Sequence, residues 1–263
     1  MDGAGRDGPS HITYKDLPCL CPYTYQRSSE WGLGTVFYKN AYLCTKKKRG
    51  KRMANVKVKG SAKLFDSKVL ELLTRTHPLV ILGMYIPLCA WLMWYFHGHI
   101  NPSALVLTGV FFAGLFSWTF FEYILHRYVF HFVNDTKWAQ RFHYYAHGVH
   151  HEYPKDKQRL VMPPIPSIII AGMFFLLFWL IMDSYGFVFF SGFMIGYLCY
   201  AMIHYSMHAF RPPHNFTKFL WEYHNIHHFR YPNKAFGVSS PLWDHIFGTV
   251  PPKIEKKQAV TGK

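Results

Sequence analysis

The chain has 263 residues, of which 50% are hydrophobic and 19% aromatic, and it carries a formal net charge of +15. The charged residues need water and the apolar residues need a hydrocarbon environment, so this composition excludes an ordinary soluble domain. No nucleic-acid-binding motif accompanies the basic residues, so we expect no nucleic acid partner and expect anionic membrane lipids instead.

The N-terminal part is polar and basic. Residues 1–63 are rich in Gly and Lys and include the run KKKRGKR at 46–52, which indicates a mostly loose cytosolic segment without a cleaved signal peptide. Residues 64–263 form the second predicted domain. At its start, residues 63–76 place apolar side chains at roughly helical spacing, as in an amphipathic helix that lies in the membrane interface.

Four apolar runs follow, and each is close to the roughly 20 residues that a helix needs to cross a bilayer core. Short polar stretches join the first run to the second and the third to the fourth, which predicts two helical hairpins. The predicted spans are about 79–96, 104–125, 165–182 and 187–203.

The distribution of positive charge predicts the orientation of these spans. All 29 Lys and Arg residues fall in 1–77, 126–164 and 204–263, which this topology puts on one side of the membrane. Cytosolic loops carry the excess of Lys and Arg in membrane proteins. We therefore expect both termini and the central loop to be cytosolic.

Ten of the 17 histidines form four tight groups at or just beyond the cytosolic ends of the second and fourth spans. Four such groups on one face of a membrane disfavour the alternative that they are satisfied interfacial or pH-sensing histidines. The groups are His126 with His131; His147, His150 and His151; His204 with His208; and His224, His227 and His228.

The spacing within the groups aims the imidazoles together. Residues at i, i+3 and i+4 share one helix face, which fits HGVHH, HYSMH and HNIHH. HRYVFH (126–131) has an i, i+5 spacing, which leaves its two rings about 140° apart on a regular helix. We therefore expect that helix to end or distort between them.

Ten imidazoles are too many for one ion, so the set predicts two metal ions with about five nitrogens each. Ligand type alone leaves Fe, Zn, Cu and Ni open. Zinc usually takes four ligands and has no redox chemistry, so the larger sets favour iron and O₂ chemistry. Glu152 and Glu222, beside HxxHH groups, are the preferred carboxylates for orienting imidazole N–H groups; Glu122, Asp135 and Asp244 are weaker candidates. A solvated carboxylate is an equal alternative for each of them.

The other seven histidines are not expected to be ligands, although His143, four residues before His147, stays open. They are His11, His77, His97, His99, His143, His214 and His245.

Residues 75–250 resemble the fatty acid (sphingolipid) 2-hydroxylases of the sterol desaturase/fatty acid hydroxylase superfamily. The histidine pattern is shared by the whole superfamily, whereas RLVMPP (159–164) and the FGVSSPLWD…FGT ending (236–249) look specific to the 2-hydroxylases. The resemblance rests on EYILHRYVFH (122–131), HGVHHEYPKDKQRLVMPPIP (147–166), YAMIHYSMH (200–208), and YHNIHH with FGVSSPLWDHIFGTVP (223–228 and 236–251).

The resemblance implies an all-α integral membrane protein, with four transmembrane helices capped by a cytosolic helical domain that holds a dinuclear metal site. It also implies how the ligands divide. One ion would take His126, His131, His147, His151 and His227, and the other His150, His204, His208, His224 and His228.

The implied activity is hydroxylation of carbon 2 of a long-chain fatty acyl group, free, CoA-linked or in ceramide, using O₂. Iron is the expected catalytic metal, and zinc can occupy the same sites. Residues 1–75 lack the HPGG haem motif of members with a fused cytochrome b5 domain, so a separate cytochrome b5 and its reductase would supply electrons at the endoplasmic reticulum membrane.

Three alternatives remain open at this stage. A sterol C4-methyl oxidase or sterol C5-desaturase of the same superfamily would keep the histidines and change the pocket. A metal transporter would need histidines within the spans, and these lie at span ends. The third alternative is a non-catalytic metal-binding membrane protein.

Overall fold

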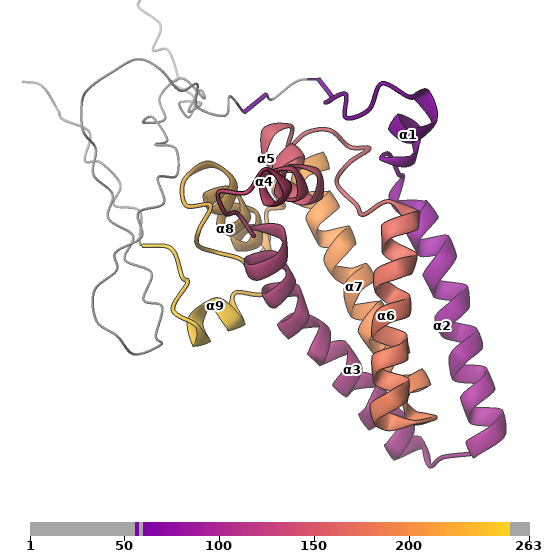
Figure 1. Ribbon diagram of the computed structural model, residues 1–263. Coiled ribbons are helices and arrows are strands. Elements are labelled where there is room, and N and C mark those ends of the chain that lie inside the picture. Colours follow the sequence, from indigo (N-terminus) through magenta and orange to yellow (C-terminus); the bar gives the residue numbers. More distant parts are fainter. Residues whose placement is uncertain (1–55, 58–59, 253–263) are drawn as a thin grey trace, which may run out of the picture. The chain divides into compact units, whose positions relative to one another are not determined.

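The computed structural model describes residues 56, 57 and 60–252 (Figure 1). The predicted segment 1–63 therefore lies almost entirely outside the described residues, as does His11. Every regular element among the described residues is helical, which confirms the predicted all-α fold class. The elements are α1 (Lys68–Leu73), α2 (Pro78–Ile100), α3 (Ala104–Ile124), a π-helical segment (Leu125–Phe130), α4 (Lys137–His143), a second π-helical segment (Tyr144–Gly148), α5 (Val149–Glu152), α6 (Pro164–Met182), α7 (Tyr185–Ala209), α8 (Lys218–Phe229) and α9 (Leu242–Ile246).

Four helices in the described part of the chain are long and apolar enough to cross a membrane: α2, α3 with its π-helical extension, α6 and α7. They occupy the four apolar runs of the sequence. Local sequence explains where they begin. Pro78 starts α2, where its missing N–H costs nothing, and Ser103 caps α3 by accepting a hydrogen bond from the Val106 amide.

Helix α7 is the central helix of the bundle and packs against α2, α3 and α6 (Figure 1). In its most apolar stretch 61% of the residues are buried, against 28% or less in the other three helices. Large apolar side chains such as Leu105, Trp94 and Ile181 are instead strongly exposed on the outer helices. Lipid is the solvent that such side chains need, so α2, α3 and α6 shield α7 from the bilayer.

Helices α3 and α7 approach each other closely because each presents a glycine to the backbone of the other. A Cβ atom on Gly114 would lie 2.0 Å from the carbonyl oxygen of Phe189, and one on Gly192 would lie 1.9 Å from that of Phe111. Small residues allow such contacts between membrane helices. The contact aligns α3 with α7. The π-helical extension of α3 and the end of α7 carry histidines at the same end of the pair.

Helices α4, α5 and α8 gather near that end of α3 and α7 (Figure 1). Helix α9 packs along α3, where the Trp243 indole N–H donates to the Thr119 hydroxyl at 3.0 Å. These short helices form the helical cap that the family resemblance implied.

The predicted amphipathic helix at 63–76 is shorter than expected. Only Lys68–Leu73 is helical, with Ser67 as its N-cap. The preceding residues are held out of the helix because the Glu71 carboxylate accepts hydrogen bonds from the backbone amides of Leu64 and Phe65.

Candidate metal centre

The ten histidines that the sequence singled out lie together in two groups of five. In each group one ring nitrogen per residue lies within 4.8 Å of the others. The first histidine group contains His126, His131, His147, His151 and His227, and the second contains His150, His204, His208, His224 and His228. This is the same division that the family resemblance implied, and the role of these residues as metal ligands remains a prediction.

The two groups are built from elements far apart in the sequence. Helix α7 supplies only the second group, and the end of α3 supplies only the first. Helices α5 and α8 each contribute to both, so the two groups are neighbours: the His151 and His228 rings stack with their centroids 4.2 Å apart.

A π-helical segment brings His126 and His131 together despite their i, i+5 spacing. The chain leaves the α-helical path at Leu125, and the His131 amide donates to the His126 carbonyl at 3.2 Å, an i to i+5 bond. This wider turn brings the two rings to a centroid distance of 5.1 Å. The expected distortion is therefore present, and it takes the form of a π-helical turn.

Within each group the Nε2 atoms converge. In the first group His147 Nε2 lies 3.1 Å from that of His126 and 2.9 Å from that of His151. In the second, His150 Nε2 lies 3.0 Å from that of His204 and 3.1 Å from that of His228.

Backbone carbonyls fix the tautomer of three of these rings. Nδ1 of His126 lies 2.6 Å from the Phe236 oxygen, Nδ1 of His227 lies 2.7 Å from the Lys234 oxygen, and Nδ1 of His204 lies 3.1 Å from the Leu160 oxygen. A carbonyl only accepts, so each Nδ1 carries the hydrogen and each neutral ring turns an Nε2 lone pair toward its group.

The chemistry of this donor set fits metal ions. Lone pairs that face one another at about 3 Å repel, and a cation between them removes the repulsion. Burial, and next the neighbouring imidazoles, lower the pKa of His147, His150 and His224 well below 6.5. These rings are therefore neutral at pH 7, which is the form that binds metal.

The carboxylates preferred from the sequence do not orient the imidazoles, so that expectation was wrong. Glu152 pairs with Lys57 and accepts from the Tyr144 hydroxyl, and Glu222 forms an exposed pair with Lys218. Backbone carbonyls of two loops orient the imidazoles instead. They were missed because every residue has a carbonyl, although Leu160 lies in RLVMPP and Phe236 begins FGVSSPLWD, the two segments that looked specific to the 2-hydroxylases.

The described histidines outside the ten belong to neither group. His143 lies beside the first group, where its Nδ1 donates to the Phe130 carbonyl at 2.6 Å and so stabilises the end of the π-helical segment. His77 caps α2, and His97 and His99 lie at its opposite end.

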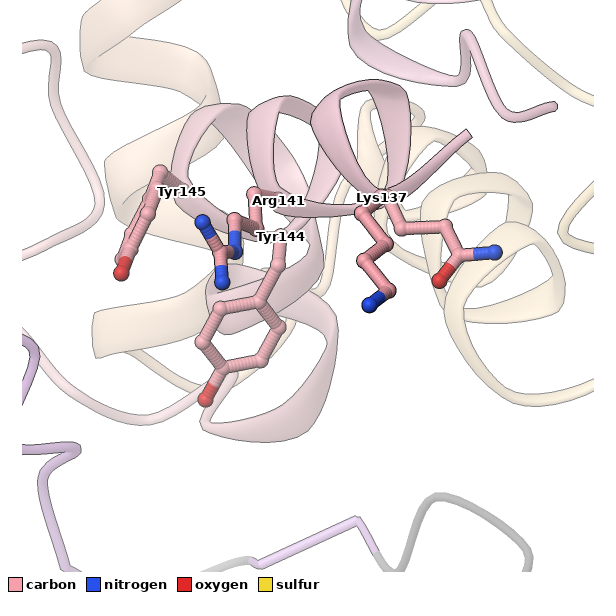
Figure 2. Close-up of a pocket in the computed structure, with 5 residues that line it drawn as sticks. Lys137, Arg141, Tyr144 and Tyr145 are labelled. Carbon is pink, nitrogen blue, oxygen red and sulfur yellow. The ribbon is translucent and has the colours of Figure 1, made fainter. Parts of the chain in front are cut away.

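A separate hollow of about 270 Å³ lies on α4 and the segment after it, and none of the ten histidines lines it. Figure 2 shows the side chains of Lys137, Arg141, Tyr144 and Tyr145 around it. No described carboxylate forms an ion pair with Lys137 or Arg141, so this part of the cap presents free positive charge.

Comparison with known proteins gives one consistent family. The fatty acid hydroxylase family model matches residues 111–249. The dihydroceramide fatty acyl 2-hydroxylase FAH1 of Arabidopsis thaliana is 36% identical over 197 residues, which cover 74% of this chain and 83% of the relative. The fatty acid 2-hydroxylase of Homo sapiens is 32% identical, and the match covers 73% of this chain and 57% of the human protein.

A solved structure of full-length scs7p, in which only the hydroxylase domain is visible, superimposes with a TM-score of 0.69 at 36% sequence identity. The match covers 74% of each chain. The matched family region contains all ten histidines, so the resemblance seen in the sequence is confirmed. The chain belongs to the fatty acid hydroxylase family.

Proposed function

We propose that the protein is a membrane monooxygenase that hydroxylates carbon 2 of long-chain fatty acyl groups, free or in ceramide and other sphingolipids. The observation that carries the proposal is the pair of adjacent five-imidazole groups at the ends of membrane-spanning helices. Such a position lets an acyl tail stay in apolar surroundings while its carboxyl end meets the reactive centre.

The ten histidines are the proposed metal ligands, with one ion in the first histidine group and one in the second. When bound, the two ions supply the activation of O₂, for which we expect iron, and zinc is able to fill the same nitrogen sites. The protein contributes neutral imidazoles, fixed tautomers and a buried setting that excludes water.

Hydroxylation needs a reductant. The C–H bond, one O₂, two electrons and two protons give a C–OH group and one water. We assign electron supply to a separate cytochrome b5 with its reductase. The Lys137 and Arg141 hollow on α4 is the proposed docking site, since an acidic surface complements it.

We place the protein in the endoplasmic reticulum membrane with both termini and the histidine groups on the cytosolic side. The confinement of all 29 Lys and Arg residues to one side of the four spans supports this orientation. Residues 1–63 form a basic cytosolic segment and residues 64–263 the hydroxylase domain.

The experiment is lipid analysis after expression in a host that lacks its own acyl 2-hydroxylase. Wild type is expected to give 2-hydroxylated acyl chains, and His150→Ala is expected to give at most about one hundredth as much, because even outer partners of metal ligands cost 10–100-fold. Glu222→Gln, on the exposed side of α8, is the control and should resemble wild type. Oxidised sterols without 2-hydroxy acyl chains would refute the proposed substrate.

A further inference from the structure

The loop between α8 and α9 carries two of the three carbonyls that fix ring tautomers. The Lys234 oxygen accepts from His227 and the Phe236 oxygen accepts from His126. Both rings belong to the first histidine group, whereas the second group takes its one carbonyl from Leu160, in a different loop. The geometry of the first group therefore depends on how this loop is held.

Asp244 of α9 holds the loop at Phe236 and Gly237. Its Oδ1 accepts from the Phe236 amide at 2.9 Å and from the Thr249 hydroxyl at 2.6 Å, while its Oδ2 accepts from the Gly237 amide at 2.8 Å. The side chain is completely buried. Each carboxylate oxygen of Asp244 thus accepts a hydrogen bond from one of two successive backbone amides.

Glu122 holds the next two residues of the same loop. Its Oε1 accepts from the Val238 amide at 2.6 Å and from the Ser239 amide at 2.8 Å, and its Oε2 accepts from the Ser239 hydroxyl at 2.5 Å. Glu122 lies on α3, one helical turn before His126, so one helix presents both a histidine of the first group and an anchor of the loop that orients it.

Neither carboxylate forms an ion pair with any described Lys, Arg or His residue. Both are buried, and a buried carboxylate without hydrogen bonds is very unfavourable. Four successive backbone amides, from residues 236 to 239, satisfy these two carboxylates. The main chain of the loop is thereby fixed from two helices at once.

We propose that Glu122 and Asp244 are positioning residues for one of the two metal ions. They fix the backbone of residues 236–239, which includes the Phe236 carbonyl that orients His126. The Lys234 carbonyl that orients His227 lies two residues before this anchored stretch, in the same loop. The inference rests on the proposed metal-binding function of the first histidine group. It predicts that loss of these anchors weakens the ion in that group and leaves the ion in the second group bound.

Replacing the carboxyl group by a carboxamide has a different effect at each of the two positions. The comparison therefore separates positioning from a simple effect of charge. In Glu122→Gln, one amide oxygen still accepts from both backbone amides, and the new NH₂ group donates to the Ser239 hydroxyl. In Asp244→Asn, the NH₂ group must face either the Phe236 or the Gly237 amide, so two donors oppose each other. Each substitution replaces a carboxyl group by a neutral carboxamide of the same shape.

The test is metal content per chain by elemental analysis of the purified full-length protein, together with the chelator concentration that removes each ion. Glu122→Gln is expected to hold both ions as tightly as wild type. Asp244→Asn is expected to release its first ion at a chelator concentration at least tenfold lower than wild type, so that one ion remains. Glu222→Gln, a matched substitution on exposed α8, should keep both. Retention of the second ion shows that Asp244→Asn is folded.

Gly237→Ala perturbs the loop without changing any charge, because its Cβ would lie 2.1 Å from the Ser240 carbonyl oxygen. It replaces Asp244→Asn if that variant is not recovered as monodisperse protein, and it should also keep one ion. Two tightly held ions in the perturbed variant, or loss of an ion from Glu122→Gln, would overturn the inference. A wild type that binds no metal would instead refute the proposed function.

Discussion

Arg159 forms a buried salt bridge with Glu71, which lies 88 residues earlier in the chain. The Arg159 side chain is 3% exposed and also pairs with Asp156 at 2.8 Å. This network ties the segment before α2 to the loop before α6. The next residue, Leu160, supplies the carbonyl that holds His204, so the network also supports the second histidine group.

Arg159→Leu is expected to lower the free energy of unfolding by about 3–5 kcal/mol, because it leaves Glu71 and Asp156 without their buried partner. Arg75→Leu is the matched control. Arg75 pairs with the same Glu71 but is 36% exposed, and such a pair contributes about 0–1 kcal/mol. Thermal unfolding in detergent measures both variants. Equal losses for the two would contradict the assignment of the buried pair as the dominant one.

Glu71 should make stability depend on pH in the acid range. Burial opposes its ionisation, but hydrogen bonds from the Leu64 and Phe65 amides and the Arg75 and Arg159 guanidinium groups lower its pKa from 4.5 to about 2. A lowered folded-state pKa stabilises the protein above pH 4.5, and that contribution is lost as the pH falls toward 2.

The comparison is wild type against Glu71→Gln in thermal unfolding over this pH range. The wild type should lose part of its advantage over the variant as the pH falls. A constant difference between the two proteins would show that the Glu71 carboxylate keeps an ordinary pKa in the folded state.

Gly192→Ala should separate α3 from α7, because its Cβ would lie 1.9 Å from the Phe111 carbonyl oxygen. Overpacking of this kind costs about 1–3 kcal/mol, and here it also shifts the helices that carry His126 and His204. Gly172→Ala on α6 is the control, since no atom lies within 4 Å of its added Cβ. Thermal unfolding and hydroxylase activity should fall for the first and not for the second.

The docking proposal predicts that charge reversal at Lys137 and Arg141 raises the KM for reduced cytochrome b5 by about tenfold at low salt. Steering by surface charges is screened by salt, so the difference from wild type should shrink at high ionic strength. Lys218→Glu on α8 controls for net charge when it is compared with Lys137→Glu and Arg141→Glu, each made singly. An equal effect of Lys218→Glu would place the docking site elsewhere on the basic face.

The length of the apolar runs predicted the spanning helices, because it depends on residue types alone. The ten histidines were found for the same reason: spacing on a helix decides which imidazoles share a face. For His126 and His131 the spacing predicted a distortion without its form, since several irregular turns bring residues i and i+5 together. The structure selects the π-helical one.

Sequence patterns could not predict the partners of the imidazoles. Glu152 and Glu222 were favoured because they adjoin histidines in the sequence, yet on α5 and α8 those neighbours contact lysines or tyrosine. Glu122 and Asp244 act through main-chain amides of an irregular loop, to which no pattern of residue types points. Only the tertiary fold brings these groups together.

The use of main-chain carbonyls to orient His126, His204 and His227 has a consequence for mutation. All twenty amino acids carry that oxygen, so no single substitution at residues 160, 234 or 236 deletes it. Insertions and deletions in these loops do displace it, because they change which residue stands opposite each ring. The orientation of these rings should therefore be kept when residue types in the loops change and be lost when loop length changes.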